Sequence, residues 1–583
     1  MMVITGLMRQ RLEASAYADP VDPLNGTDAN ASPRQLVADD AVRDLGPIRS
    51  FASRRPLLVV MVPLLALCVF SLFLDIGWPN SMTGEAFIGH ADQASVAEAA
   101  RSIAEGKGPV VSNYWIHTGG QGIGTTKFPH LEPYWSIYGA YSIAPFFKVF
   151  GANRTSLLAA ASAAKALAAI AVAFTVFMLT NRRLPTFMAG YVVLFEPSML
   201  LTISGLTDIY MVAAAASFAA CFVALRRRSL LWAVPLGFTA GYAMGQRPPL
   251  GYVFLAPLLG LIVLGFTRRV GRDVKAGLIA ISAAVVAFLP YLKIQYDAWG
   301  TLISPGSRLV SDALRLAYVS GDHNDAFYNP TAVFPPDAPN RFEGSLEYLK
   351  AFGQNLADGR VVPFWLMIFG LAGVVACIPL IAVPLWRRLR GNPSERVQFD
   401  ERVASLMMGG FMMVVAVVQA SLIHFEARYW AYLIPLTAIA GFGMGFAWNK
   451  PMAMAVLVLV GGSAYRYHST NSPVTELPPA VAVYTSFLPD DAVVLTGNPW
   501  QFAFHTRRGA IAMPYTGDLN ALLDVAGLYG ATYIVADESF SPFRHWTQKK
   551  WFSGEREIPA SFVVEYAQDG IIILRILSYD EMR

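Results

Sequence analysis

The stretch "GHADQASVAEAARSIAEGKG" (residues 89–108) is polar and follows the first long apolar run of the chain. After Asp92, apolar side chains recur at the spacing of one face of a short amphipathic helix. Gly106 and Gly108 are expected to end that helix. Asp92 lies where an N-cap would lie, and such a cap contributes about 1 kcal/mol. The alternative, compatible with capping, is that Asp92 is the acid/base group of an enzyme.

Composition indicates a polytopic membrane protein. Of the 583 residues, 55% are apolar and only 15% are charged, well below the charged quarter that is typical of soluble domains. The net charge of +4 is small, and the basic residues form short clusters between apolar runs, which argues against a nucleic-acid surface. The three cysteines, Cys68, Cys221 and Cys377, lie inside apolar runs, which argues against a disulfide framework.

The apolar runs predict about eleven membrane spans, since a span needs about 20 apolar residues. They are 57–77, 155–180, 185–203, 207–225, 230–246, 249–267, 275–293, 362–386, 402–424, 428–447 and 450–466. With a cytoplasmic N-terminus, this count places the arginine clusters at the span ends on the cytoplasmic side. Residues 131–150 are apolar and aromatic, and we interpret them as an interfacial or re-entrant segment. A full span there is the alternative, and it would place later arginine clusters outside.

This topology divides the chain into three parts. Residues 1–54 are predicted to be a disordered cytoplasmic tail. Residues 55–466 form the transmembrane domain, with external loops at 78–154 and 294–361. Residues 467–583 form a C-terminal extracytoplasmic α/β domain. Its expected strands are 491–497, 509–515 and 531–537, followed by a hairpin around Asp569-Gly570. A helix is expected within residues 517–530.

The opening stretch also carries a family resemblance. Residues 92–101 read DQASVAEAAR, which is similar to the pattern D-E-x-x-Y-A-E-x-x-R in the first external loop of the GT-C superfamily. These are polytopic glycosyltransferases, and the most similar are the lipid-phosphate-sugar-dependent mannosyl-, aminoarabinose and arabinofuranosyltransferases. The departures are Gln93 in place of the second acid and Val96 in place of the aromatic residue. Further segments match in order: "FPHLEPYWSIYGAYSIAPFFKVFG" (128–151), "GLTDIYM" (205–211), "GQRPPLGY" (245–252), "LPYLKIQYDAWGTLISPGS" (289–307) and "FEARYWAYLIPLTA" (425–438).

The resemblance implies transfer of a sugar from a polyprenyl-phosphate donor to the hydroxyl of a glycan, lipid or protein acceptor. A carboxylate suits deprotonation of that hydroxyl, and the resemblance makes Asp92 the general base. Arginines suit the phosphate, because the guanidinium fork meets its oxygens bidentately. The implied substrate-binding residues are Asp208, Arg247, Arg428, Glu98 and Arg101. The alternatives are a solvated turn for Asp208 and interfacial arginines for Arg247 and Arg428.

Two further observations bear on the site. Lys165 and Glu196 lie within predicted spans, where charges are usually paired, and we expect them to pair or to line the cavity. The predicted external histidines and Glu426 show no compact ligand spacing, so no metal site is assigned, and a divalent metal stays an open alternative. They are His90, His117, His130, His323 and His424.

The sequence also bears on the cellular location of the protein and on alternative functions. The absence of a retention signal favours a bacterial inner membrane. A transporter or lipid flippase would favour inverted repeats around a midplane site, and we find no repeat. A non-catalytic cell-envelope assembly protein on the same fold is a further alternative, which Gln93 and Val96 leave open.

Overall fold

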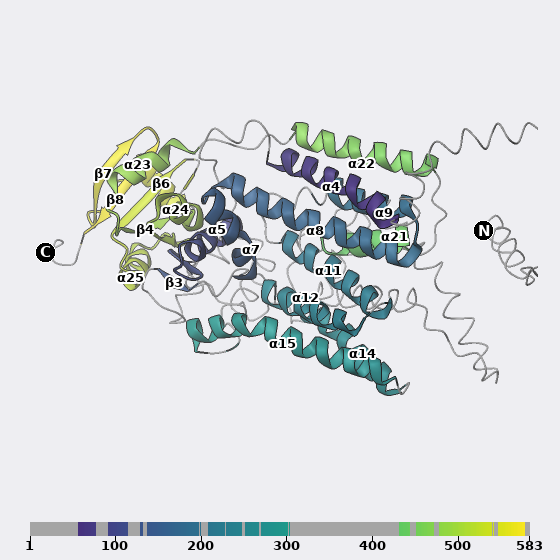
Figure 1. Cartoon of the computed structure of the whole chain (residues 1–583). Helices are drawn as coiled ribbons and strands as arrows, with labels where there is room; N and C mark the ends of the chain where they lie inside the picture. The colour runs from purple at the N-terminus through teal and green to yellow at the C-terminus, as the bar shows by residue number, and fades with distance from the viewer. Residues whose placement is uncertain are drawn as a thin grey trace, which may run out of the picture. The chain divides into compact units, whose positions relative to one another are not determined.

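The chain is mostly helical (Figure 1). The computed structural model describes residues 56–76, 91–114, 129–131, 137–196, 199, 208–227, 229–247, 251–267, 270–300, 302, 431–443, 450–470, 477–538, 540–541 and 546–577. Within these residues, four helices are long and apolar enough to cross a membrane. They are α4 (Pro56–Asp75), α8 (Arg154–Thr180), α11 (Asp208–Arg227) and α15 (Gly271–Trp299).

Shorter helices account for further predicted spans. These are α9 (Arg183–Phe195), α12 (Ala233–Gln246), α14 (Leu255–Thr267), α21 (Leu433–Gly443) and the longer, less apolar α22 (Lys450–Thr470). The short 3-10 helices η2 (Leu230–Trp232) and η3 (Tyr252–Phe254) precede α12 and α14. Each predicted span that falls on described residues therefore overlaps a helix. The spans predicted at 362–386 and 402–424 lie outside the described residues, as do the tail and most of the loop at 294–361.

Residues 131–150 contain the helix α7 (Ile137–Phe150), which has 14 residues. At 1.5 Å per residue it is about 21 Å long, shorter than the roughly 30 Å hydrocarbon core of a bilayer. Several helices that overlap predicted spans, such as α12, are equally short, so the interfacial or re-entrant interpretation of residues 131–150 stays a prediction. α7 packs on α8 and on the helix that carries Asp92.

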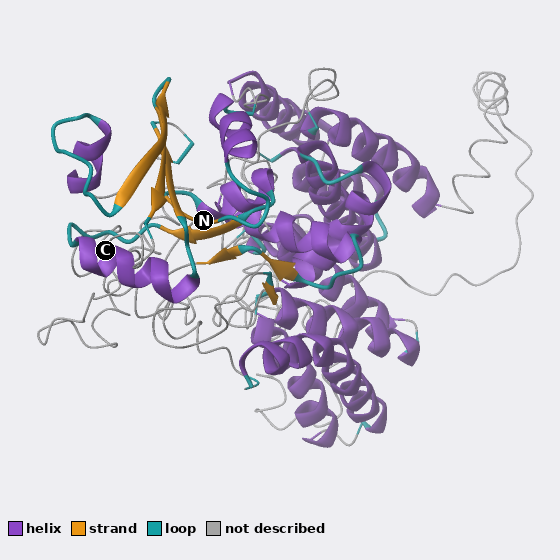
Figure 2. Cartoon of the chain, turned by 90° about the vertical axis from the view of Figure 1, so that its left-hand side faces the viewer, coloured by secondary structure: helices purple, strands orange, loops and turns teal. Residues whose placement is uncertain are grey.

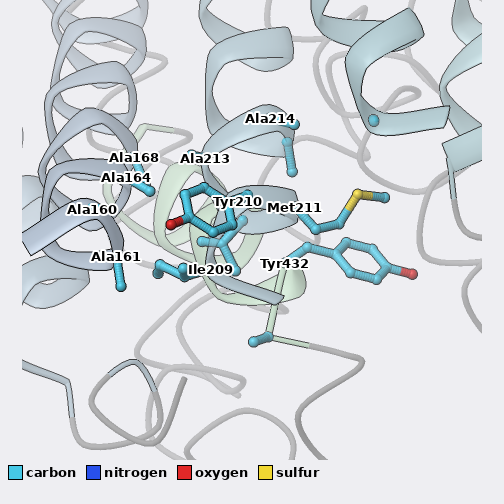
Figure 3. Packing of buried hydrophobic residues seen from close by; sticks show 14 of the residues in the cluster. Ala160, Ala161, Ala164, Ala168, Ile209, Tyr210, Met211, Ala213, Ala214 and Tyr432 are labelled. Carbon is cyan, nitrogen blue, oxygen red and sulfur yellow. The ribbon is translucent and has the colours of Figure 1, made fainter. Parts of the chain in front are cut away.

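Small side chains bring the central helices close together. Figure 3 shows alanines of α8 beside the first turns of α11, where Tyr210 lies among them. The alanines labelled on α8 are Ala160, Ala161, Ala164 and Ala168. α12 also approaches α15 closely, because a Cβ atom added at Gly237 would lie 2.0 Å from the carbonyl oxygen of Ala280. Small residues at such contacts are the usual means by which membrane helices pack.

Ion pairs join the ends of these helices. Arg226, at the end of α11, contacts Asp273, near the start of α15, with 2.6 Å between Nη1 and Oδ1. At the opposite end of α11, Asp208 contacts Arg247, the residue that follows α12. The two ends of α11 therefore have separate polar contacts, each made with a neighbouring helix.

A six-stranded mixed sheet occupies the C-terminal part of the chain (Figure 2). Its order is β2-β5-β4-β6-β8-β7, parallel from β2 to β6 and antiparallel from β6 to β7. The strands are β4 (Val493–Thr496), β5 (Gly509–Ala512), β6 (Tyr533–Asp537), β7 (Phe562–Gln568) and β8 (Ile571–Ile576). The accompanying helices are α23 (Pro479–Phe487), α24 (Pro499–Thr506), α25 (Leu519–Tyr529) and α26 (Trp546–Phe552).

The strands and helix predicted in this part of the chain are confirmed. Asp569 and Gly570 both adopt positive φ values, 52° and 70°, as a two-residue type I′ hairpin turn requires. α25 begins after Asp518, whose side chain accepts a hydrogen bond from the backbone N–H of Asn520, and it ends at Gly530 in the left-handed conformation. Local sequence signals therefore define these elements.

One strand of this sheet comes from a distant part of the chain. β2 (Asn113–Tyr114) lies in the predicted external loop 78–154 and pairs in parallel with β5. Beside it, β1 (Val110–Val111) pairs antiparallel with β3 (His130–Leu131). The sheet is thus not confined to residues 467–583, where the sequence predicted the C-terminal domain.

Candidate functional site

Helix α5 (Ala91–Ala104) carries Asp92. The helix begins at Ala91, so the backbone of Asp92 lies in the first turn and not at the N-cap position that the sequence suggested. An acid in the first turn interacts favourably with the helix dipole. Residues 93–101 of α5 are all buried, polar Gln93, Ser95 and Glu98 included, so the prediction of a helix buried on one apolar face was wrong.

Glu98 connects α5 to Ser112 and to Asn113, the first residue of β2. Its carboxylate accepts hydrogen bonds from the backbone N–H of Ser112 at 2.8 Å and from Nδ2 of Asn113 at 2.6 Å. Burial raises the pKa of Glu98, against the lowering effects of Arg101 and of these hydrogen bonds. The predicted contact of Glu98 with substrate stays a prediction, because the described contacts are made with the protein.

Arg101 joins α5 to the C-terminal sheet region. Its Nη1 donates to the carbonyl oxygen of Phe504, in α24, at 2.6 Å, and its guanidinium carbon lies 4.9 Å from the centre of the Phe504 ring. Glu98 is also close, with 4.0 Å between Nη2 and Oε1. Burial lowers the pKa of Arg101. The substrate contact predicted for Arg101 is likewise untested by this arrangement.

Asp208 and Arg247, predicted separately from two motifs, form an ion pair. The distance between Arg247 Nη2 and Asp208 Oδ1 is 2.9 Å. Asp208 stands in the first turn of α11 with a side chain only 4% exposed, whereas the Arg247 side chain is 24% exposed. A buried acid thus holds a partly exposed arginine. Arg428, the other predicted phosphate ligand, lies outside the described residues.

A second buried ion pair involves an acid that the sequence analysis did not select. Lys165 Nζ lies 2.6 Å from Oδ2 and 2.8 Å from Oδ1 of Asp75, and Ser162 donates to the same carboxylate. Lys165 is therefore paired with Asp75 and not with Glu196. The available signal was a carboxylate near the end of the apolar run 57–77, because a charge inside a span usually has a partner.

Comparison with known proteins gives the fold. The sequence matches no protein-family model and no curated protein. The structure is similar to the oligosaccharyltransferase of Archaeoglobus fulgidus determined with zinc and sulfate, with a TM-score of 0.52, 12% identity, and coverage of 81% of this chain and 67% of that one. It is also similar to ArnT from Cupriavidus metallidurans bound to undecaprenyl phosphate, with a TM-score of 0.51, 11% identity, and coverage of 89% and 98%.

The chain has the GT-C fold. Both neighbours are GT-C glycosyltransferases, so the fold agrees with the resemblance noted in the sequence. Identities of 11% and 12% establish the architecture, whereas activity has to be argued from the residues of the site. Among the described residues, Asp92 follows α4, a long apolar helix, and its catalytic role stays a prediction.

His130 is the predicted external histidine that lies within the described residues. His130 is buried, and its ring nitrogens lie 2.9 Å from the carbonyl oxygens of Asn113 and Leu131. Burial lowers the pKa of His130. Across the described ranges, no group of three or more His, Cys, Asp or Glu side chains is arranged to hold a metal ion. The other predicted external histidines and Glu426 lie outside those ranges.

Proposed function

We propose that this protein is an integral-membrane glycosyltransferase that uses a polyprenyl-phosphate sugar. The observation that carries the proposal is the similarity to almost the full length of an ArnT structure that contains undecaprenyl phosphate. The four long apolar helices support a membrane location. We further propose an inner-membrane protein with a cytoplasmic N-terminus and an extracytoplasmic sheet region.

Asp92 is the proposed general base. The acceptor hydroxyl attacks the anomeric carbon while the Asp92 carboxylate takes its proton, and the carbon–oxygen bond to the lipid phosphate breaks. The first turn of α5 suits this role, because a helix N-terminus favours the charged form of a carboxylate. The acceptor is a hydroxyl of a glycan, lipid or protein.

Arg247 is the proposed phosphate ligand, together with Arg428. A guanidinium has five N–H donors, and a quarter of the Arg247 side chain is exposed beside its contact with Asp208. Asp208 would then orient Arg247 toward the leaving phosphate. The arginine would stabilise the negative charge that develops on that phosphate. A divalent metal, as in the zinc-containing neighbour, is a further candidate ligand of the donor phosphate.

The experiment compares Asp92→Asn with the wild type in lipid nanodiscs. Radiolabelled polyprenyl-phosphate sugars serve as donors, and membrane extract supplies acceptors. Asparagine has nearly the size and shape of aspartate, so this change removes the base, and the lost first-turn charge costs the helix only about 0.3–1 kcal/mol. Transfer should fall by about 10²-fold or more, the usual contribution of a general base.

The matched control is Asp518→Asn. Asp518 only caps α25, so this variant should transfer at the wild-type rate. Near-normal transfer by a folded Asp92→Asn protein would contradict the assignment and make Asp208 the next candidate base. A wild type that transfers nothing from any donor, with acceptor supply verified, would contradict the proposed function.

A further inference from the structure

Helix α5 is held by the C-terminal sheet region through contacts far from Asp92. Nine residues separate Asp92 from Arg101, or about 13 Å along the helix axis. Arg101 therefore contacts α24 from the end of α5 opposite to Asp92. An effect of Arg101 on chemistry at Asp92 has to pass through the helix itself.

The contact with α24 is well suited to fix an orientation. Phe504 lies in the last turn of α24, where backbone carbonyls lack partners within the helix and where a cation is favoured by the helix dipole. Arg101 supplies that cation at 2.6 Å and also stacks above the Phe504 ring. A hydrogen bond and a ring contact on one residue together restrict both the position and the angle of the guanidinium.

A second connection joins the same two regions. Glu98 holds the backbone N–H of Ser112, and the carbonyl oxygen of Ser112 accepts a hydrogen bond of 2.8 Å from the N–H of Ala510, in β5. α24 and β5 are consecutive in the chain. The β4–α24–β5 unit is therefore connected to α5 at two points, directly through Arg101 and through Ser112 by way of Glu98. The exposed pair Glu105–Arg507 adds little, because surface ion pairs are weak.

We infer that Arg101 is a positioning residue, which sets the orientation of α5, and with it Asp92, against α24. The C-terminal sheet region is then part of the framework of the active site. The inference rests on the proposed function for its catalytic consequence, whereas the coupling of α5 to α24 is independent of any activity. It differs from a direct contact between Arg101 and substrate, which the sequence resemblance implied.

Hydrogen exchange tests the coupling without a substrate. Full-length wild type, Arg101→Ala and the milder Arg101→Lys are compared in nanodiscs. Loss of a buried charged hydrogen bond should raise exchange about tenfold in α5 and in the last turn of α24. Exchange in α25 and α15 should stay unchanged, which distinguishes coupling from general destabilisation. Lysine should restore part of the protection. Unchanged exchange in α5 would overturn the inference.

Turnover then separates positioning from binding. With the polyprenyl-phosphate sugar that the wild type uses, Arg101→Ala should lower kcat about tenfold and leave the donor KM within about twofold, since Arg101 does not meet the donor. Added guanidinium ion should restore part of the rate. A donor KM that rises tenfold at unchanged kcat would instead indicate direct donor binding and overturn the inference.

The matched control is Arg575→Ala. Arg575 lies in β8 of the same sheet and pairs with Glu565 at 3.0 Å on the surface. Neither exchange in α5 nor turnover should change in this variant. An inactive wild type would contradict the proposed function alone, because the exchange experiment would still decide the coupling.

Discussion

Replacing Lys165 by methionine should destabilise the protein strongly. The ammonium group lies 2.6 and 2.8 Å from the two carboxylate oxygens of Asp75, and both side chains are only 1% exposed. Methionine keeps the length of the side chain and removes the charge, so the carboxylate is left buried without its counter-ion. Breaking a buried pair from one side costs about 3–5 kcal/mol. The hydroxyl of Ser162 still donates to this carboxylate, which favours the lower end of that range.

The assay is equilibrium unfolding in mixed micelles with increasing denaturing detergent, and the chain offers a matched control. Lys293 and Asp297 have the same separation of 2.6 Å, but their side chains are 74% and 42% exposed. Lys293→Met should cost less than about 0.5 kcal/mol. The double variant Lys165→Met with Asp75→Asn should be more stable than Lys165→Met alone, since no lone charge is then buried. Equal losses for Lys165→Met and Lys293→Met would refute the reasoning from burial.

Three further tests, which use four substitutions, probe other parts of the structure by thermal unfolding in detergent. Gly237→Ala should cost about 1–3 kcal/mol, because the new Cβ would lie 2.0 Å from the carbonyl oxygen of Ala280. Gly260→Ala, with no atom within 4 Å of the new Cβ, should be neutral or stabilising, and an equal cost at both sites would contradict this packing. Arg508→Lys should cost about 2–3 kcal/mol, since the buried guanidinium donates to several backbone carbonyls that an ammonium cannot reach together. A loss below 0.5 kcal/mol, roughly the effect of a surface change, would contradict the importance of these hydrogen bonds. Burial lowers the pKa of His130, so the neutral ring stabilises the folded state above about pH 6.5. This contribution should be lost as the pH falls toward the lowered pKa, at up to about 1.4 kcal/mol per pH unit. His130→Asn should remove that dependence, and an unchanged pH profile would argue against a neutral buried ring.

Local patterns were sufficient for most of the secondary structure. Apolar runs of span length predicted helices, and the Asp569-Gly570 turn between two strand-like runs predicted the hairpin, because both signals lie within neighbouring residues. With Asp92 as the N-cap the helix would begin at residue 93, and it begins two residues earlier, at Ala91, so Asp92 lies in the first turn. Helix boundaries routinely carry an uncertainty of this size.

Contacts between distant residues could not be predicted in the same way. Arg101 and Phe504 are 403 residues apart in sequence, and Lys165 and Asp75 are 90 apart. No periodicity relates such positions, since their meeting depends on how whole helices pack. The addition of β2 to the C-terminal sheet was missed for the same reason.

The candidate site was found in part. Asp208 and Arg247 were selected from separate motifs, and the structure brings them to 2.9 Å. Their pairing follows from the fold, because consecutive helices that reverse direction bring the start of one and the end of the next to the same side. Asp75 was missed because the apolar run around it concealed one charged residue near its end.

The position of β2 has a consequence for biosynthesis. Asn113 aligns with Ala510, so a ribosome has to add nearly 400 further residues before this edge strand can find its neighbour. During that interval Arg101 of α5 has no α24 carbonyl to which it can donate its hydrogen bond. Long-range pairing of this kind is slow to form. A nascent chain that stops before residue 512 would therefore contain the helices of the bundle while the helix that carries Asp92 still lacked its final support.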